Sequence, residues 1–416
     1  MQEAKPILIC TNIPDGNSPM ILSYINYLLS DKKKVVFSSK ISNLNFPKEV
    51  KVSTTNYLKY KYHLILYPII TLLIIFVVVI SYARNWAAAK KNFSITKFTK
   101  DILASTKYYV NHLAINVFHF YQMVKNRPQY IVCICAGSTA AARWYGSITN
   151  TRFAYSLYEI YPNQLVTDYY FRRRLKANIE MKGCKAASTI FIPYSDQFIR
   201  LIRLRYGIKD IDKFTKLVSL PKEVDIPVFK ESSFPIKFYY HGSFDNQRGL
   251  DIMIDAIRNF SPNKAVLYLR GFGPLDQFLK EKVSKDQLGN HVTFLPPLPP
   301  DQLAASACEY DVGLSLVKGL TPNNRFLIGF KALDYICAGI ASFVPNNYVL
   351  GTMVKSRNIG VSYDKLDVKD LSISISKLLN LNLLDDYKKK SIVFAKSEIN
   401  FLEQRNTFLN RLTKSS

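Results

Sequence analysis

The sequence predicts an α/β chain with two domains, each built around a parallel sheet. Two strand–helix–strand patterns carry this prediction, one near the amino terminus and one at 310–344. Short, continuous apolar runs such as 6–10 and 340–344 are typical of parallel strands that are buried on both faces. The 416 residues are enough for two cores, because single hydrophobic cores stop growing beyond about 250–300 residues.

The first domain is expected over 1–218 and opens with a strand, a helix and a strand at 6–10, 20–29 and 34–38. Such a βαβ opening is typical of a Rossmann-like domain. The loop after the first strand is rich in turn-forming residues, and Gly16 is its only glycine. A ligand-binding loop and an ordinary strand–helix loop are both open for Gly16.

An apolar segment interrupts this domain. Residues 64–83 carry no charge and are long enough to span a bilayer as a helix. A single crossing would place the strands at 6–10 and 130–135, which belong to one sheet, on opposite sides of the membrane. Aromatic residues such as Trp86 flank the segment, as they do at membrane interfaces. We therefore predict a membrane-associating insertion at about 57–126 without net crossing; a true span and a buried core helix are the alternatives.

The mixed apolar and polar stretch at 102–124 is the expected return partner of this segment. The 56 Lys and Arg against 31 Asp and Glu give a net charge of +25, which indicates an anionic partner. No nucleic-acid-reading motif is present, so an acidic lipid surface is favoured over nucleic acid. The six cysteines lack metal-ligand spacing and the N-terminus lacks a signal-peptide pattern. We expect a peripheral or monotopic protein at the cytoplasmic face of a membrane.

Charged residues of the first domain mark two candidate sites. Glu159 follows a predicted strand at 153–157, where a carboxylate would lie at the edge of a cleft. Arg172, Arg173 and Arg174 belong to a predicted helix at 168–182. This run forms either a solvated face or a contact with anionic headgroups or a pyrophosphate. Pairing of Glu159 with these arginines is the alternative to a cleft acid.

A proline-rich linker at 219–236 leads to a second domain over 237–398. Its first strand ends at Gly242, which would let a ligand approach the backbone. Arg248 comes just before the next predicted helix, where its planar guanidinium could bind a diphosphate. A helix-start arginine without a ligand is the alternative. A final helix at 399–416 has apolar positions that permit packing back on the first domain.

The strand–helix–strand unit at 310–344 carries the main candidate site. A long polar loop follows its first strand, at the sheet edge where ligands bind in open parallel sheets. Lys331 and Asp334 are three residues apart, so they share one face of the helix near its positive end. A cation, a carboxylate and a helix amino terminus together suit a phosphorylated ligand that bears hydroxyl groups.

These motifs resemble the donor-sugar half of GT-B glycosyltransferases of the family-4 type. The family pattern is an acidic strand motif, an Asn, Lys-x-x-Glu-Tyr and Ala-Gly. In this chain it reads Asp311-Val312-Gly313-Leu314, Asn323, Lys331-Ala332-Leu333-Asp334-Tyr335 and Ala338-Gly339. Two positions depart from the pattern: Asp334 replaces Glu, and Phe326 stands where many members carry a second Glu. The Asp side chain is shorter by about one methylene, roughly 1.5 Å.

The resemblance implies two Rossmann-like domains that face each other across a cleft and a metal-independent, retaining hexosyltransferase. It implies catalytic roles for Arg248, Lys331, Asp334 and Glu159. Donor-binding residues would be Gly242, Arg248, Gly271, Leu295, Asn323, Lys331 and Asp334. Gly16, Trp86, Arg172, Arg173 and Arg174 would contact the acceptor or the membrane. No cofactor is expected, because the nucleotide sugar is a substrate.

Three functions remain open from the sequence. The first is a membrane-associated glycosyltransferase that acts on a lipid-linked or surface glycan in the biosynthesis of cell-envelope polysaccharide. A nucleotide-sugar epimerase or hydrolase is the second, and a catalytically inactive, membrane-docked homologue is the third. The apolar segment and the +25 charge favour the first over the second. The donor sugar, nucleotide, acceptor and linkage are not readable from the sequence.

Overall fold

The computed structural model describes residues 5–11, 19–39, 48–54, 95–160, 170–193, 195–218, 220, 227–318, 324–326 and 328–413. The apolar segment 64–83 and the candidate residues Gly16, Trp86 and Asn323 lie outside these ranges. Inside them, no helix combines the length and the apolar character that crossing a bilayer requires.

The N-terminal lobe is built on a parallel sheet with the order β3-β2-β1-β4-β5-β6-β7. Its strands are β1 (Ile7–Thr11), β2 (Val35–Ser39), β3 (Val50–Thr54), β4 (Tyr130–Ile134), β5 (Phe153–Ser156), β6 (Thr189–Ile192) and β7 (Phe214–Lys216). Its helices are α1 (Pro19–Ser30), α3 (Ile95–Asn126), α4 (Thr139–Thr149), α5 (Tyr170–Ala186) and α6 (Asp196–Tyr206). Strands β1, β2, β4, β5 and β6 are buried at every residue, as expected where helices cover both faces of a sheet.

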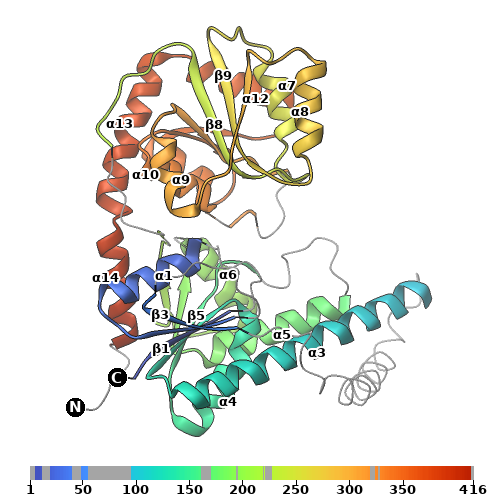
Figure 1. The fold of residues 1–416 in the computed structure, drawn as a ribbon, viewed down its shortest axis with the longest axis vertical. Coiled ribbons are helices and arrows are strands. Elements are labelled where there is room, and N and C mark those ends of the chain that lie inside the picture. Colours follow the sequence, from blue (N-terminus) through green and yellow to red (C-terminus); the bar gives the residue numbers. More distant parts are fainter. Residues whose placement is uncertain are drawn as a thin grey trace.

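The C-terminal lobe repeats this arrangement with the parallel order β10-β9-β8-β11-β12-β13. Its strands are β8 (Ile236–Ser243), β9 (Ala265–Phe272), β10 (Val292–Leu295), β11 (Val312–Leu314), β12 (Ala341–Pro345) and β13 (Gly360–Tyr363). Its helices are α7 (Leu250–Ile257), α8 (Asp276–Lys285), α9 (Pro300–Ala307), α10 (Phe330–Cys337), α11 (Leu350–Arg357), α12 (Val368–Leu378) and α13 (Leu381–Glu398). The two predicted parallel-sheet domains are therefore present, one above the other in Figure 1.

Both sheets reverse their strand order at one point. The reversal lies between β1 and β4 in the N-terminal lobe and between β8 and β11 in the C-terminal lobe. Loops that leave neighbouring strands at such a point diverge, which opens a crevice at the carboxyl ends of the strands. Ligands of open α/β sheets bind there, so the ends of β8 and β11 are where a site is expected.

The stretch 102–124, predicted as a return partner for the apolar segment, is part of the long helix α3. Its carboxyl-terminal half packs on the N-terminal lobe through a buried polar residue. Asn116 Nδ2 donates to Gly137 O at 2.7 Å, and Asn116 Oδ1 accepts from Ala141 N at 2.8 Å. This half of the stretch is therefore part of the helical layer of the domain and not a segment that returns through a membrane.

The last two helices connect the lobes. Helix α13 packs on the C-terminal lobe and α14 (Phe401–Thr413) lies beside α1 of the N-terminal lobe (Figure 1). The ring of Phe408 stacks on Tyr24 with centroids 4.7 Å apart. Gln404 Oε1 accepts a hydrogen bond of 2.8 Å from Val218 N, at the end of the N-terminal lobe.

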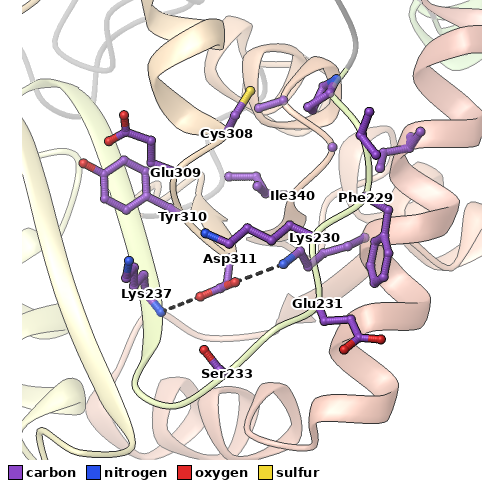
Figure 2. A pocket seen from close by; sticks show the side chains of 16 residues that line it. Phe229, Lys230, Glu231, Ser233, Lys237, Cys308, Glu309, Tyr310, Asp311 and Ile340 are labelled. Carbon is purple, nitrogen blue, oxygen red and sulfur yellow. Dashed lines mark hydrogen bonds and ion pairs between the residues drawn. The ribbon is translucent and has the colours of Figure 1, made fainter.

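A buried ion pair fastens α13 to the amino-terminal edge of the C-terminal sheet. Lys388 Nζ lies 3.0 Å from Asp311 Oδ1, and the two side chains are only 6% and 13% exposed. Asp311 Oδ2 also accepts from Lys237 N at 3.0 Å (Figure 2). Lys388 Nζ donates in addition to Ser232 Oγ at 3.1 Å. The network joins β8, the start of β11, α13 and the segment that enters the domain.

Removal of one partner of this pair should destabilise the C-terminal lobe strongly. Lys388→Met leaves a buried carboxylate without its cation, and such a change costs roughly 3–5 kcal/mol. The double variant Lys388→Met/Asp311→Asn should recover part of this loss, because no uncompensated charge is left. Denaturant unfolding measures both free energies.

Lys390→Met is the matched control on the same helix. Its partner Asp386 and Lys390 itself are each 44% exposed, so its loss should cost at most about 1 kcal/mol. Equal losses for the two single lysine variants would contradict the proposed importance of the buried pair.

Candidate functional site at the carboxyl ends of β8 and β11

The strand–helix–strand unit predicted at 310–344 is present as β11, α10 and β12. Gly339 follows α10 with φ 67°, the left-handed conformation that ends a helix without steric cost for glycine. Helix α10 begins at Gly329, which has no side chain to cap the first N–H groups, and of these the Ala332 N–H donates to Gly329 O at 3.0 Å. The unit therefore directs the amino terminus of α10 towards the strand-order reversal.

Two glycines allow the side chain of Lys331 to lie across the backbone of β8. Gly242, in β8, has φ 130°, and a Cβ there would overlap Lys331 Cε and lie 2.8 Å from its Nζ. Gly271 is the register partner of Gly242 on β9, has φ 145°, and a Cβ there would overlap Gly242 O. Lys331 therefore lies directly over a strand backbone, in space that a side chain at residue 242 would fill.

The surroundings of Lys331 lower its pKa but leave it charged at neutral pH. Burial lowers the pKa of Lys331 to about 8, and the positive charge of Arg248 acts in the same direction. The carboxylates of Asp334 and Asp245 oppose the shift. The ammonium group also lies 5.5 Å from the ring centroid of Tyr240. An anionic ligand that reached this cluster would find two cations already assembled.

Arg248 is held at the entrance of the same cluster. Its Nε lies 3.4 Å from Asp245 Oδ2, while its backbone N–H donates to Asp245 O at 3.1 Å. The side chain is 32% exposed, and its buried Nε has no hydrogen-bond partner within the described ranges. Gly249, with φ 58°, follows it and begins α7. The guanidinium is thus anchored at one edge and available at the other.

Asp334 has a partner that sequence reasoning did not identify. His241 Nε2 lies 3.1 Å from Asp334 Oδ2, and these side chains are 3% and 13% exposed. The one available signal was the position of His241, directly before Gly242 at the end of a strand. In the part of the chain that the structure describes, no three His, Cys, Asp or Glu side chains are grouped so that they could hold a metal ion.

The other predicted residues are distributed around this cluster or lie in the opposite lobe. Leu295 ends β10 and packs against the aromatic cluster of Tyr239 and Tyr310. Glu159 is exposed after β5, and its neighbour Tyr158 stacks on Phe330 of α10 with centroids 6.0 Å apart. Glu159 is therefore close in sequence to a residue that reaches the start of α10.

The three arginines Arg172, Arg173 and Arg174 lie on α5 of the N-terminal lobe, and Arg173 and Arg174 are exposed. Phe326 packs against the N-terminal core and against a second cluster that includes Ile328 and Phe394. At the position where many members of the similar family carry a second Glu, this chain thus has Phe326, which makes an apolar contact between the lobes. The structure brings Arg248, Lys331 and Asp334 together and leaves the arginine run on the other lobe.

No protein-family model and no curated protein matches the chain. Solved structures do. HepE of Anabaena in complex with UDP aligns with a TM-score of 0.67 at 11% identity over 98% of this chain and 100% of that one. Sucrose-phosphate synthase from Thermosynechococcus elongatus gives 0.66 at 13% identity, over 99% and 100%. WaaG, a glycosyltransferase involved in lipopolysaccharide biosynthesis, gives 0.61 at 12% identity, over 98% and 99%. The chain therefore has the predicted GT-B fold.

The charge cluster makes a prediction about the titration of Lys331. Arg248→Gln removes a neighbouring positive charge, so it should raise the pKa of Lys331 above about 8; Asp334→Asn should lower it. The pH dependence of the Lys331 ¹³Cε chemical shift measures both. An unchanged pKa in both variants would mean that the three side chains do not share one site in solution.

Proposed function

We propose that the chain is a glycosyltransferase that moves a sugar from a nucleotide-diphosphate sugar to an acceptor. The observation that carries this proposal is a pair of cations at the strand-order reversal of the C-terminal sheet: Lys331 lies over the backbone of Gly242, and the charge of Arg248 is close enough to act on it. HepE, which shares the fold, has been solved with UDP and with UDP-glucose. A nucleoside diphosphate is a ligand whose charge and size suit such a cluster.

The proposed chemistry follows from where charge develops. As the sugar–phosphate bond breaks, negative charge grows on the leaving diphosphate, and preorganised donors stabilise it best. Arg248 offers a planar pair of donors, Lys331 a compact charge, and the start of α10 its N–H groups. Gly271, Leu295 and Asn323 complete the proposed donor site, with Leu295 towards the base.

In this proposal the two cations take the place of a divalent ion, so the transfer of a hexosyl group is metal-independent. Retention of the anomeric configuration is proposed only from the resemblance to family-4 enzymes. Asp334 accepts a hydrogen bond from a hydroxyl of the donor. Two groups are candidates for taking the acceptor proton: Glu159, in the N-terminal lobe, and the departing phosphate oxygen of the donor. The stack of Tyr158 on Phe330 supports a place for Glu159 near the donor site.

The proposed acceptor is a lipid-linked or surface glycan at the cytoplasmic face of a membrane, in the biosynthesis of cell-envelope polysaccharide. The net charge of +25 supports an anionic surface as partner. Helix α3 supports it too, because Val117, Tyr121 and Val124 form one exposed stripe at helical spacing, 56%, 57% and 48% exposed. WaaG and the outer core galactosyltransferase WaaB, both of this fold, are named for lipopolysaccharide synthesis. Gly16, Trp86 and the arginines of α5 are the proposed acceptor-side or membrane contacts.

One observation favours a second candidate, a catalytically inactive homologue. Phe326 contributes packing between the lobes at a position where many similar enzymes carry a carboxylate. Loss of that carboxylate would lower the affinity for the sugar and leave nucleotide binding intact. The experiment below separates the candidates.

The direct test incubates the protein with radiolabelled nucleotide sugars and membrane extract. Transfer of label to a lipid or glycan acceptor is the expected result. Arg248→Ala and Lys331→Ala should each lower kcat/KM by about 10²–10³-fold, the usual effect of removing one preorganised donor. The controls Arg258→Ala and Lys285→Ala remove exposed cations of the same lobe and should leave activity unchanged.

Turnover of the donor without any acceptor would favour an epimerase or hydrolase. Nucleotide binding without turnover would favour the inactive homologue. Equal activity of the Arg248→Ala variant and the unaltered protein would remove the donor site from consideration.

The affinity for a nucleoside diphosphate should fall as the pH rises above about 8. The free protein loses the Lys331 proton there, and the bound diphosphate needs the charged form. Each further pH unit should weaken binding up to about tenfold until the Lys331 pKa in the complex is reached. Calorimetric titrations between about pH 6.5 and pH 9.5 measure this dependence. Lys331→Arg should bind with little change over the same range, because its guanidinium stays charged. Parallel profiles for the two proteins would exclude Lys331 as the titrating group.

A further inference from the structure

We infer that His241 is a positioning residue: it holds Asp334 so that one carboxylate oxygen is free to accept a hydrogen bond from a sugar hydroxyl of the bound ligand. This inference rests on the proposed function and names the group that compensates for the short side chain at residue 334. The hydroxyl belongs either to the ribose of the nucleotide or to the transferred sugar, which present the same chemistry.

The hydrogen bond between the two residues has a defined direction. A carboxylate only accepts, so the contact of 3.1 Å between His241 Nε2 and Asp334 Oδ2 requires the imidazole proton to be on Nε2. His241 Nδ1 is buried and has no hydrogen-bond partner in the described part of the chain. A proton on Nδ1 would therefore be buried without an acceptor, and the Nε2–H tautomer is the one that the site accommodates.

The imidazole is neutral in this environment. Burial lowers the pKa of His241 below its ordinary value, and the positive charges of Lys331 and Arg270 act in the same direction. The Asp334 carboxylate opposes this shift, through its hydrogen bond and its charge. A neutral donor fixes the carboxylate and leaves its negative charge available to the ligand.

The ring of His241 is itself held in place. Its backbone N–H donates to Tyr335 Oη at 3.2 Å, and Tyr335 Oη donates to Leu314 O at 3.2 Å. The rings of His241 and Tyr335 meet edge to face with centroids 5.0 Å apart. Because Tyr335 directly follows Asp334, the same contacts fix α10 against β8 and β11. The space for the Tyr335 ring exists because Gly313 has no side chain.

The other carboxylate oxygen is available. Asp334 is 13% exposed, and within the described ranges its Oδ1 makes no hydrogen bond. An aspartate reaches less far than a glutamate, so its angle towards a ligand matters more. With Oδ2 bonded to His241, the rotation of the carboxylate is fixed and Oδ1 remains for the ligand.

The test compares two substitutions of similar size that differ in the donor they retain. His241→Gln places its amide nitrogen about where Nε2 lies, so it should keep the hydrogen bond and retain nucleotide-sugar kcat/KM within about threefold. His241→Phe keeps the ring but removes the donor, and its kcat/KM should fall about tenfold to a hundredfold. In the Asp334→Asn background, His241→Phe should cause no further loss, because the carboxylate that it positions is gone.

Binding measurements assign the hydroxyl. A loss of affinity in His241→Phe for both the nucleoside diphosphate and the nucleotide sugar supports the ribose. Loss for the nucleotide sugar alone supports the transferred sugar. Unchanged binding and unchanged kcat/KM in a folded His241→Phe variant overturn the inference, as does a variant whose loss persists in the Asp334→Asn background.

A purely structural role would lower the unfolding temperature without the rescue by glutamine or the dependence on Asp334. If His241→Phe does not fold, His241→Asn replaces it, because its shorter amide does not reach Asp334; equal activity of the Asn and Gln variants would then overturn the inference. Failure of the proposed function gives a different result: the unaltered protein itself binds no nucleoside diphosphate. Both the proposed function and the positioning role of His241 are then rejected. If the unaltered protein transfers the sugar normally and His241→Phe does not change its activity, only the positioning role of His241 is excluded, and the proposed function stands.

Discussion

The candidate site depends on the close approach of a side chain to a strand backbone. Lys331 can lie over β8 only because residue 242 has no side chain, and β8 and β9 meet there only because residue 271 has none. This contact buries the ammonium group, which lowers its pKa, and places it in the field of Arg248. Lys331 is therefore positioned by a helix and two strands of the scaffold, which is the arrangement that keeps a charged site in one geometry, while Arg248 lies in the turn between β8 and α7.

Much of the fold could be predicted because its signals are local. The strands predicted at 6–10 and 340–344 are present as β1 and β12, each shifted by one residue, since a short apolar run identifies a buried strand without reference to the rest of the chain. Strand order was beyond such signals, because β4 pairs with β1 across a long insertion. The long helix α3 was misassigned for a related reason: Asn116 bonds to Gly137, a contact that no local pattern shows.

The candidate site divides in the same way. Spacing along one helix was enough to place Lys331 beside Asp334. The position of Arg248, just before a predicted helix, was enough to indicate it as a candidate for binding a diphosphate. His241 escaped notice because a histidine in an apolar strand is ordinarily a core residue; its partner lies 93 positions later and meets it only when α10 packs on β8. Phe326 could be recognised as a departure from a pattern, but its contact with the N-terminal core follows from how the lobes meet.

The path of the last helix affects how the chain can fold during its synthesis. Phe408 is fully buried against Tyr24 and Phe191, so a core of the N-terminal lobe is completed by a residue that follows the C-terminal lobe in sequence. Chains usually fold domain by domain, with the leading domain first, as they leave the ribosome. Here the leading lobe emerges with Tyr24 and Tyr27 incompletely covered and stays so until the second lobe has been translated. The N-terminal core is thus complete only after residues 401–413 have followed the whole second lobe out of the ribosome.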